Sequence, residues 1–357
     1  MKLLLSLLVV LALCAGCAGV DGQPQTSDAD SEVQASVHDT GSPQADMSPG
    51  DTVSTDLPNS ELWHEACPLD TIEERLIDVG DVTLNVGCRG SGPTVVFLHG
   101  FPEFHYSWKR VMDELASEYR LVAPDQRGFN LSDKPADIAA YKIQHLMDDI
   151  RLLIPKVSPD PVLLVGHDWG GPVGWMVAHH PEAGVRGYLA VNGPHPHRFA
   201  TLIENDPAQK EASAYMDFFR MEGSEDFLTP DYFAQDFASF LTEDELARYV
   251  EAWSQPGAIT GGLNWYRANS LAVSDVEEGM ASLLEQIPFP VSVLWGLDDA
   301  FVLPQNAEGL EVYAPDLVVE TFAGVDHWIE HRIPEEVARA IRELDARSVT
   351  VEKGDSQ

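Results

Sequence analysis

A pentapeptide in the middle of the chain is suited to carry a nucleophile. Residues 166–170 read Gly-His-Asp-Trp-Gly, directly after an apolar run at 161–165 and before a stretch with a helical pattern. Glycines flank the central residue because a sharp turn from strand to helix leaves no room for side chains. That residue is Asp168, and a carboxylate with a reference pKa of about 3.9 is already ionised at neutral pH. The motif therefore predicts a nucleophile that needs no base before it attacks.

A carboxylate nucleophile is suited to displacement at a strained or activated sp³ carbon, and such an attack leaves an alkyl ester on Asp168. A base must then activate water to hydrolyse that ester. His327 follows a predicted strand at 317–322 and is the expected base, although a loop histidine without a role is the alternative when it is taken alone. The expected product is an alcohol from a ring-opened or halide-displaced substrate.

Two neighbouring carboxylates, Asp298 and Asp299, compete for the part of the acid that orients His327. Both follow the predicted strand at 291–295, so either would lie at the carboxyl edge of a sheet. The chain order of nucleophile, acid and histidine is the order of the α/β-hydrolase fold. In that fold, backbone amides after the first buried strand form an oxyanion hole. The expected donors here are the N–H groups of Phe101 and Trp169.

The elements that must position these residues alternate between buried strand and helix, which implies a mostly parallel sheet with helices on both faces. Two strands at 72–79 and 82–88 read as a hairpin. The further predicted strands are 94–98, 120–123, 161–165, 185–191, 291–295 and 317–322, and the predicted helices are 106–118, 141–156, 171–179 and 334–344. The segment 196–284 breaks the alternation, because it is helical in pattern and rich in aromatic residues. We interpret it as a helical lid inserted between two strands.

Five motifs together resemble the α/β-hydrolase-fold epoxide hydrolases, over about residues 70–345. They are His99-Gly100-Phe101-Pro102-Glu103, Asp125-Gln126-Arg127-Gly128-Phe129, Gly166-His167-Asp168-Trp169-Gly170-Gly171, Asn192-Gly193-Pro194-His195-Pro196 and Asn264-Trp265-Tyr266-Arg267.

The resemblance implies hydrolysis of a small apolar epoxide to a vicinal diol. In that family two lid tyrosines donate hydrogen bonds to the epoxide oxygen. The resemblance assigns one to Tyr266 and the other to Tyr215, with Tyr232 as a nearby alternative. The family spacing also selects Asp299 over Asp298.

Other functions share part of this pattern. A haloalkane dehalogenase has the same fold and nucleophile, and Trp169 could hold a halide with its indole N–H. Phe101, however, stands where many dehalogenases carry Asn, and haloacetate dehalogenases usually have Arg in place of Trp169. Trp169 and Phe101 are thus expected to contact substrate. A tethered binding protein without turnover would not need Asp168, Asp299 and His327 together.

Neither a cofactor nor a metal is expected. The mechanism uses side chains and water alone. Two histidine pairs are the candidates for metal ligands, and neither pair favours a metal site. His179 and His180 are adjacent on a predicted helix, so their side chains diverge. His195 and His197 lie in a loop that matches the family motif.

The first 62 residues are expected to lie outside the fold. Residues 1–17 combine Lys2, an apolar run too short to span a bilayer and small residues, and end in Leu-Cys-Ala-Gly-Cys. This resembles a bacterial lipoprotein signal with Cys17 lipidated; a plain cleaved secretory signal is the alternative. Residues 18–62 contain nine acidic residues and no Lys or Arg, which predicts a disordered spacer. Either signal predicts an exported protein, and a lipid anchor would place it in the periplasm or cell envelope.

The remaining chain divides into a core at 63–195, the lid at 196–284, a second core segment at 285–346 and a tail at 347–357. In an oxidising compartment Cys67 and Cys88 could form a disulfide; two buried thiols are the alternative. The chain has 22 Lys and Arg against 58 Asp and Glu, a formal net charge of −36. Such acidity disfavours nucleic acids and anionic lipid surfaces as partners. The sequence does not specify an oligomeric state.

Overall fold

The computed structural model describes residues 62–283 and 285–354. The predicted signal sequence, Cys17 and nearly all of the predicted spacer lie outside these residues. No helix in the described part of the chain combines the length and the apolar character needed to cross a membrane.

An eight-stranded sheet with the order β1-β2-β4-β3-β5-β6-β7-β8 forms the centre of the described residues. β1 pairs antiparallel with β2, and β2 pairs antiparallel with β4, whereas every later pair is parallel. The prediction of a mostly parallel sheet that begins with a hairpin is confirmed. The strands are β1 (Glu73–Asp78), β2 (Thr83–Gly90), β3 (Thr94–Leu98), β4 (Arg120–Pro124), β5 (Val162–His167), β6 (Val185–Val191), β7 (Val291–Gly296) and β8 (Leu317–Phe322).

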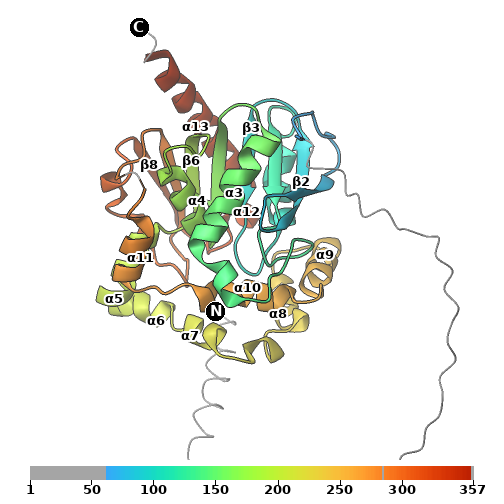
Figure 1. Ribbon diagram of the computed structural model, residues 1–357, viewed down its shortest axis with the longest axis vertical. Coiled ribbons are helices and arrows are strands. Elements are labelled where there is room, and N and C mark those ends of the chain that lie inside the picture. The colour runs from blue at the N-terminus through green and yellow to red at the C-terminus, as the bar shows by residue number, and fades with distance from the viewer. Residues whose placement is uncertain (1–61, 284, 355–357) are drawn as a thin grey trace, which may run out of the picture. The chain divides into compact units, whose positions relative to one another are not determined.

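Helices cover both faces of this sheet. α2 (Lys109–Leu115) packs against α13 (Pro334–Gly354), and α3 (Ile143–Val157) packs against α4 (Gly170–His179), which lies over the sheet in Figure 1. Every residue of β3, β4, β5 and β7 is buried. These strands are continuous apolar runs because neither of their faces meets water.

Two helices differ from their predicted extents. The predicted helix at 106–118 is split into a 3₁₀ turn, η1 (His105–Trp108), and α2. α13 continues to Gly354 instead of ending at residue 344, so most of the predicted tail is helical. No glycine or proline interrupts the chain before Gly354, and the Arg347 guanidinium donates to the Asp316 carbonyl and carboxylate, which ties this extension to the start of β8.

Seven helices lie between β6 and β7, in the segment predicted to be a lid. They are α5 (Pro196–Asn205), α6 (Pro207–Ala212), α7 (Tyr215–Arg220), α8 (Pro230–Phe237), α9 (Glu243–Trp253), α10 (Ala258–Ala268) and α11 (Val273–Met280). Figure 1 shows them gathered at one end of the sheet, opposite the end from which α13 projects. Short elements complete the fold: η2 (Ile138–Tyr141), η3 (Ser224–Asp226), η4 (Pro304–Ala307), η5 (Leu310–Val312) and α12 (Ile329–Arg332).

Hydrogen bonds hold the lid to the core at several points. The Trp265 indole in α10 donates to the Arg127 carbonyl at 2.9 Å. At the end of the same helix, the side-chain oxygen of Asn269 accepts the Ile143 N–H at 2.8 Å, which joins α10 to the start of α3. The Trp253 indole of α9 donates to the Pro102 carbonyl. The lid is therefore attached directly to the loops that follow β3 and β4.

A disulfide joins Cys67 to Cys88 in β2, with the Cα atoms 5.8 Å apart. Backbone hydrogen bonds between Cys67 and Gly90 and between Gly90 and Pro68 run beside it. Arg120 adds two more contacts, since its guanidinium donates to the carbonyls of Trp63 and Glu65. The segment that precedes β1 is thus fixed to the sheet by one covalent and several polar contacts.

We expect the double substitution Cys67→Ser with Cys88→Ser to lower the free energy of unfolding. The disulfide closes a loop with a sequence separation of 21 residues, and constraints of this size on the unfolded chain contribute about 2–4 kcal/mol. Urea unfolding followed by tryptophan fluorescence would measure the loss. Adding a reductant should destabilise the native protein but not the double variant. A double variant as stable as the native protein would contradict the assignment.

Candidate active site

Asp168 lies on the sharp turn between β5 and α4, as the sequence predicts. Its φ is +48°, in the left-handed region that residues other than glycine rarely adopt. The turn is also crowded, because a Cβ atom on Gly170 would come within 2.2 Å of the Leu98 carbonyl oxygen. Backbone strain and close packing therefore coincide at the residue predicted to be the nucleophile, a common feature of functional sites.

The carboxylate of Asp168 is held on two sides. Its Oδ1 accepts the Phe101 N–H at 2.7 Å, and its Oδ2 lies 3.5 Å from His327 Nε2. The Asp168 side chain is 12% exposed. Burial by itself raises the pKa of Asp168, but the hydrogen bond and charge of His327 and the Phe101 N–H together lower the pKa below its ordinary value. Asp168 is thus an ionised carboxylate at neutral pH.

His327 also contacts an acid on its other ring nitrogen. Its Nδ1 lies 2.7 Å from Asp299 Oδ2, and Asp299 is 3% exposed. The N–H groups of Phe301 and Val302 donate to Asp299 Oδ1 at 2.8 and 3.0 Å. Asp298 is exposed, so the structure brings Asp299, and not its neighbour, to His327.

The surroundings of His327 favour its charged form. Burial lowers the pKa of His327, but the Asp299 carboxylate, with the hydrogen bonds and charge of Asp168, raises the pKa well above 6.5. The two carboxylates flanking the ring thus outweigh the loss of hydration.

Asn192 supports this arrangement, and the sequence reasoning gave it no role. Its side-chain amide donates to Asp299 Oδ2 at 2.5 Å, and its side-chain oxygen accepts the Gly296 N–H at 2.8 Å. Asn192 follows β6 directly and has a φ of +40°. The Asn-Gly pair at 192–193 is the sequence signal for such a tight bend, but only the structure connects it to an acid 107 residues away.

The two predicted lid tyrosines lie together above Asp168. The ring of Tyr266 in α10 is 5.2 Å from that of Trp169 and 6.4 Å from that of Tyr215 in α7. Burial raises the pKa of both phenols well above 10, and the Asp168 charge raises it further, so both remain protonated. Tyr232, the alternative, packs on Phe233 in α8. Burial and the charge of Asp236 raise its pKa, and Asp168 is not among the causes, unlike at Tyr215 and Tyr266.

Arg220 connects the helices that carry these tyrosines, and the sequence gave no sign of this contact. It ends α7 five residues after Tyr215, and its Nε donates to the backbone carbonyl of Tyr266 at 3.1 Å. The guanidinium charge is among the causes that lower the pKa of both phenols, against the dominant effect of burial. Arg220 thus fixes the spacing of α7 and α10 and makes the phenols somewhat more acidic.

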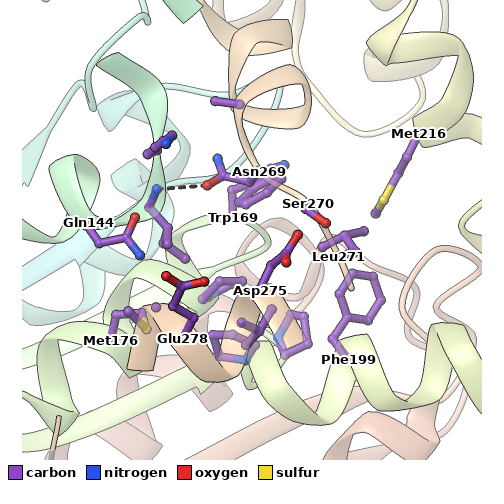
Figure 2. Close-up of a pocket in the computed structure, with 18 of the residues that line it drawn as sticks. Gln144, Trp169, Met176, Phe199, Met216, Asn269, Ser270, Leu271, Asp275 and Glu278 are labelled. Atoms are coloured by element: carbon purple, nitrogen blue, oxygen red, sulfur yellow. Dashed lines mark hydrogen bonds between the residues drawn. The ribbon is translucent and has the colours of Figure 1, made fainter. Parts of the chain in front are cut away.

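A cavity of about 640 Å³ opens beside Asp168 and Trp169. Figure 2 shows side chains from core and lid around it, with Met176 at the left of the view and Phe199 and Met216 at the right. Acidic side chains of α11, Asp275 and Glu278, are exposed and also border it. The remaining lining residues are Lys142, Ile143, Gln144, Pro172, Pro194, Pro196, Tyr215, Ala268, Asn269, Ser270, Leu271, Val276, Gly279, Ser282 and Val302.

The histidines weighed as metal ligands pair differently from the way the sequence suggests. His179 Nε2 lies 3.1 Å from His195 Nε2, and the His195 ring stacks on Tyr313 at 3.7 Å. His197 instead contacts the Tyr313 hydroxyl and Glu277. These contacts describe a buried pair of rings packed under α5 and not a shared coordination site.

Comparisons with known proteins identify the family to which the chain is similar. The sequence model of the family described as "alpha/beta hydrolase fold" matches residues 93–330. The AB hydrolase superfamily protein YfhM of Bacillus subtilis is 36% identical over 77% of this chain and 98% of its own length. Epoxide hydrolase 4 of Mus musculus is 33% identical over 70% of this chain and 71% of its own length.

Two further similarities bear on the chemistry. The crystal structure of Bacillus megaterium epoxide hydrolase in complex with an inhibitor superposes with a TM-score of 0.69 at 30% identity, over 76% of this chain and 99% of the other. The fluoroacetate dehalogenase of a Burkholderia species is 33% identical over 77% of this chain and 95% of its own length.

We expect Asp299→Asn to lower the pKa of His327. The imidazolium loses its proton as pH rises through this pKa. Without the carboxylate that stabilises the imidazolium, the loss should therefore occur at lower pH. NMR titration of histidine-labelled protein would measure the shift. Asp298→Asn removes one charge from the exposed neighbour and is the matched control. Equal shifts in the two variants would contradict the pairing of Asp299 with His327.

Proposed function

The chain belongs to the alpha/beta hydrolase family, and we propose that within it this protein is an epoxide hydrolase that converts a small apolar epoxide into a vicinal diol. The observation that carries the proposal is an ionised carboxylate, Asp168, whose charge acts on two lid phenols, those of Tyr215 and Tyr266. A carboxylate can attack one epoxide carbon while the phenols of Tyr215 and Tyr266 stabilise the epoxide oxygen. The similarity to proteins named epoxide hydrolase supports this choice.

In the first step the Asp168 oxygen not held by the Phe101 N–H attacks an epoxide carbon. A new carbon–oxygen bond forms, the ring carbon–oxygen bond breaks, and its electron pair goes to the ring oxygen. A phenol then donates a hydrogen bond or its proton to this alkoxide. The product of the step is a 2-hydroxyalkyl ester on Asp168, with its carbonyl oxygen near Phe101.

Formation of the ester also changes the acidity of the groups around it. The negative charge of Asp168 is one cause of the raised pKa of Tyr215 and Tyr266, and of His327. That charge disappears when the ester forms. The phenols therefore become stronger acids when an alkoxide needs a proton, and the pKa of His327 falls when a base is required.

In the second step His327 removes a proton from water, which attacks the ester carbonyl carbon. The developing oxyanion lies at the position that accepts the Phe101 N–H, and the Trp169 N–H is the second proposed donor. The bond between the carbonyl carbon and the alkyl oxygen breaks, His327 gives the proton taken from water to that oxygen, and the diol leaves. The proton of the new Asp168 carboxyl group returns to the phenol that was deprotonated in the first step. Asp168 retains the oxygen of the attacking water. Every step uses side chains, backbone amides and water.

Dehalogenation is the second candidate function, because the fluoroacetate dehalogenase relative covers most of this chain. Trp169 could hold a leaving halide with its indole N–H. A haloacid substrate would bring its own carboxylate into the cavity, however, and Lys142 is the sole basic residue among those that line it. Asp275 and Glu278 border the same cavity. This balance of charge favours a neutral epoxide over an anionic haloacid.

We further propose that the protein is exported with residues 1–17 as its signal, a lipid on Cys17 and residues 18–62 as a spacer. The disulfide between Cys67 and Cys88 supports an oxidising destination such as the periplasm or cell envelope, because such bonds are rare in reducing compartments.

A single turnover in heavy-oxygen water should leave the label in Asp168 and none in the diol. This follows because the water oxygen stays on the carboxylate while the original carboxylate oxygen leaves with the product. Mass spectrometry of the peptide that contains Asp168, after incubation with styrene oxide, would measure it. In separate incubations, a bromoalkane and fluoroacetate replace styrene oxide as the substrates expected of a dehalogenase. Diol formed without label in Asp168 would exclude the ester mechanism, and release of bromide or fluoride without diol would favour the dehalogenase.

We expect Tyr266→Phe to slow alkylation of Asp168 by about 10²-fold, in line with general-acid contributions. The substitution removes the hydroxyl but keeps the ring that packs on Trp169 and Phe101. Stopped-flow tryptophan fluorescence of the first turnover would report the rate. Tyr232→Phe is the matched control, because it removes a lid hydroxyl whose pKa does not respond to the Asp168 charge. An unchanged rate in Tyr266→Phe would remove this phenol from the mechanism.

A further inference from the structure

A group of buried ionisable side chains lies directly behind His327, and the mechanism above does not use it. Its members come from four parts of the chain and are at most 6% exposed: Glu103 after β3, His167 at the end of β5, Tyr249 in α9, and Glu330 and His331 in α12. The group adjoins the active site, because His167 precedes Asp168 and its ring lies 4.8 Å from that of His327.

Glu103 is the ionised member of this group. Its Oε1 accepts the Tyr249 hydroxyl at 2.9 Å and lies 2.7 Å from His331 Nε2. Burial raises the pKa of Glu103, but the charge and hydrogen bond of His331 lower it well below the ordinary range. One negative charge is therefore well supported at this position.

The contact of His167 with the backbone carbonyl of His327 decides that its Nε2 atom is protonated. His167 Nε2 lies 2.9 Å from the backbone carbonyl oxygen of His327. A carbonyl oxygen only accepts, so the Nε2 atom must carry the hydrogen. In the neutral ring this leaves a lone pair on Nδ1. That atom lies 3.2 Å from Glu330 Oε1 and 3.5 Å from Glu103 Oε2.

Without an additional proton, the Nδ1 atom of His167 and the carboxylate oxygens of Glu103 and Glu330 would all be hydrogen-bond acceptors that face one another. No donor bonds to His167 Nδ1, to Glu103 Oε2 or to either carboxylate oxygen of Glu330. Beside a neutral His167, burial and mutual repulsion of the two neighbouring carboxylates disfavour the second negative charge. Burial and the charge of Glu103 raise the pKa of Glu330 well above its ordinary value.

We propose that Glu330 is a neutral carboxylic acid at neutral pH, that its O–H donates to His167 Nδ1, and that it thereby acts as a positioning residue for His327. The proton fixes the His167 tautomer whose Nε2–H holds the backbone of His327. The positioning role rests on the proposed ester hydrolysis, in which His327 is the base. The protonation state of Glu330 does not depend on that function.

The charges around Glu330 are consistent with one added proton. The Glu330 carboxyl is faced by Glu103 from the loop after β3, by His167 from β5 and by Tyr249 from α9. His327 and His331 lie close to Glu330 along the chain. Arg110 in α2 is the nearby cation. It donates to the His331 carbonyl at 2.9 Å but pairs with Glu245 at 2.7 Å, so its charge is already balanced.

Infrared spectroscopy of the full chain would test the protonation state. We expect the C=O stretching band of a protonated carboxyl group at pH 7.5, which is lost in Glu330→Gln and kept in Glu335→Gln, a matched change at an exposed position. The absence of this band in the unaltered protein would overturn the proposal. Elemental analysis that finds one divalent metal ion per chain, lost in Glu330→Gln, would also overturn it, because a cation would then replace the proton.

Kinetics would test the positioning role. Ionisation of Glu330 at alkaline pH would remove the proton that it donates, so we expect kcat of the unaltered protein to decrease there. Gln keeps a neutral donor, so Glu330→Gln should retain kcat within about threefold and should not show this decrease. Glu330→Met removes the donor and should slow ester hydrolysis by tenfold or more, because a small misplacement of a catalytic group lowers the rate by such a factor. The rate of Asp168 alkylation should change little. Equal losses in the two variants would overturn the role. If Glu330→Met does not fold, a decrease of kcat at alkaline pH that persists in Glu330→Gln would also overturn the positioning role.

Discussion

The whole site depends on keeping one carboxylate ionised where water is nearly excluded. Asp168 sits on a strained turn, and its charge is stabilised by the Phe101 N–H and by His327. In the proposed mechanism its ionisation supplies the nucleophile without a proton transfer. The same charge raises the pKa of the base and of the acids around it, so that conversion to a neutral ester changes all of them together.

The negative charges behind His327 must be balanced as well. Asp299 receives hydrogen bonds from Asn192 and from two backbone amides, whereas Glu103 receives them from Tyr249 and His331. A further ionised carboxylate would have no donor to support it. The proposed proton on Glu330 leaves every buried charge near the base with a partner, which explains how so acidic a cluster can pack against a catalytic histidine.

The lid makes the site as much as the sheet does. The sheet alone supplies Asp168, Asp299 and His327, whose loops lie at the carboxyl ends of its parallel strands. The phenols come from α7 and α10, which Arg220 joins and which the core holds through the Trp265 indole. Lid residues also line the cavity beside the Asp168 carboxylate.

Local sequence patterns were enough to predict the fold class and the turn that carries Asp168. They also predicted the strands at 94–98, 185–191 and 317–322, which the structure reproduces residue for residue. These features are local: apolar runs, glycines beside a turn and the order of motifs are written in consecutive residues. Tertiary structure alone decided that Asn192 supports Asp299, that Arg220 links the two tyrosine helices, and that Glu330 meets Glu103 from the far end of the chain. Such contacts join residues that are distant in sequence, and whether a buried acid finds a donor or a second acid there depends on packing that no local pattern records.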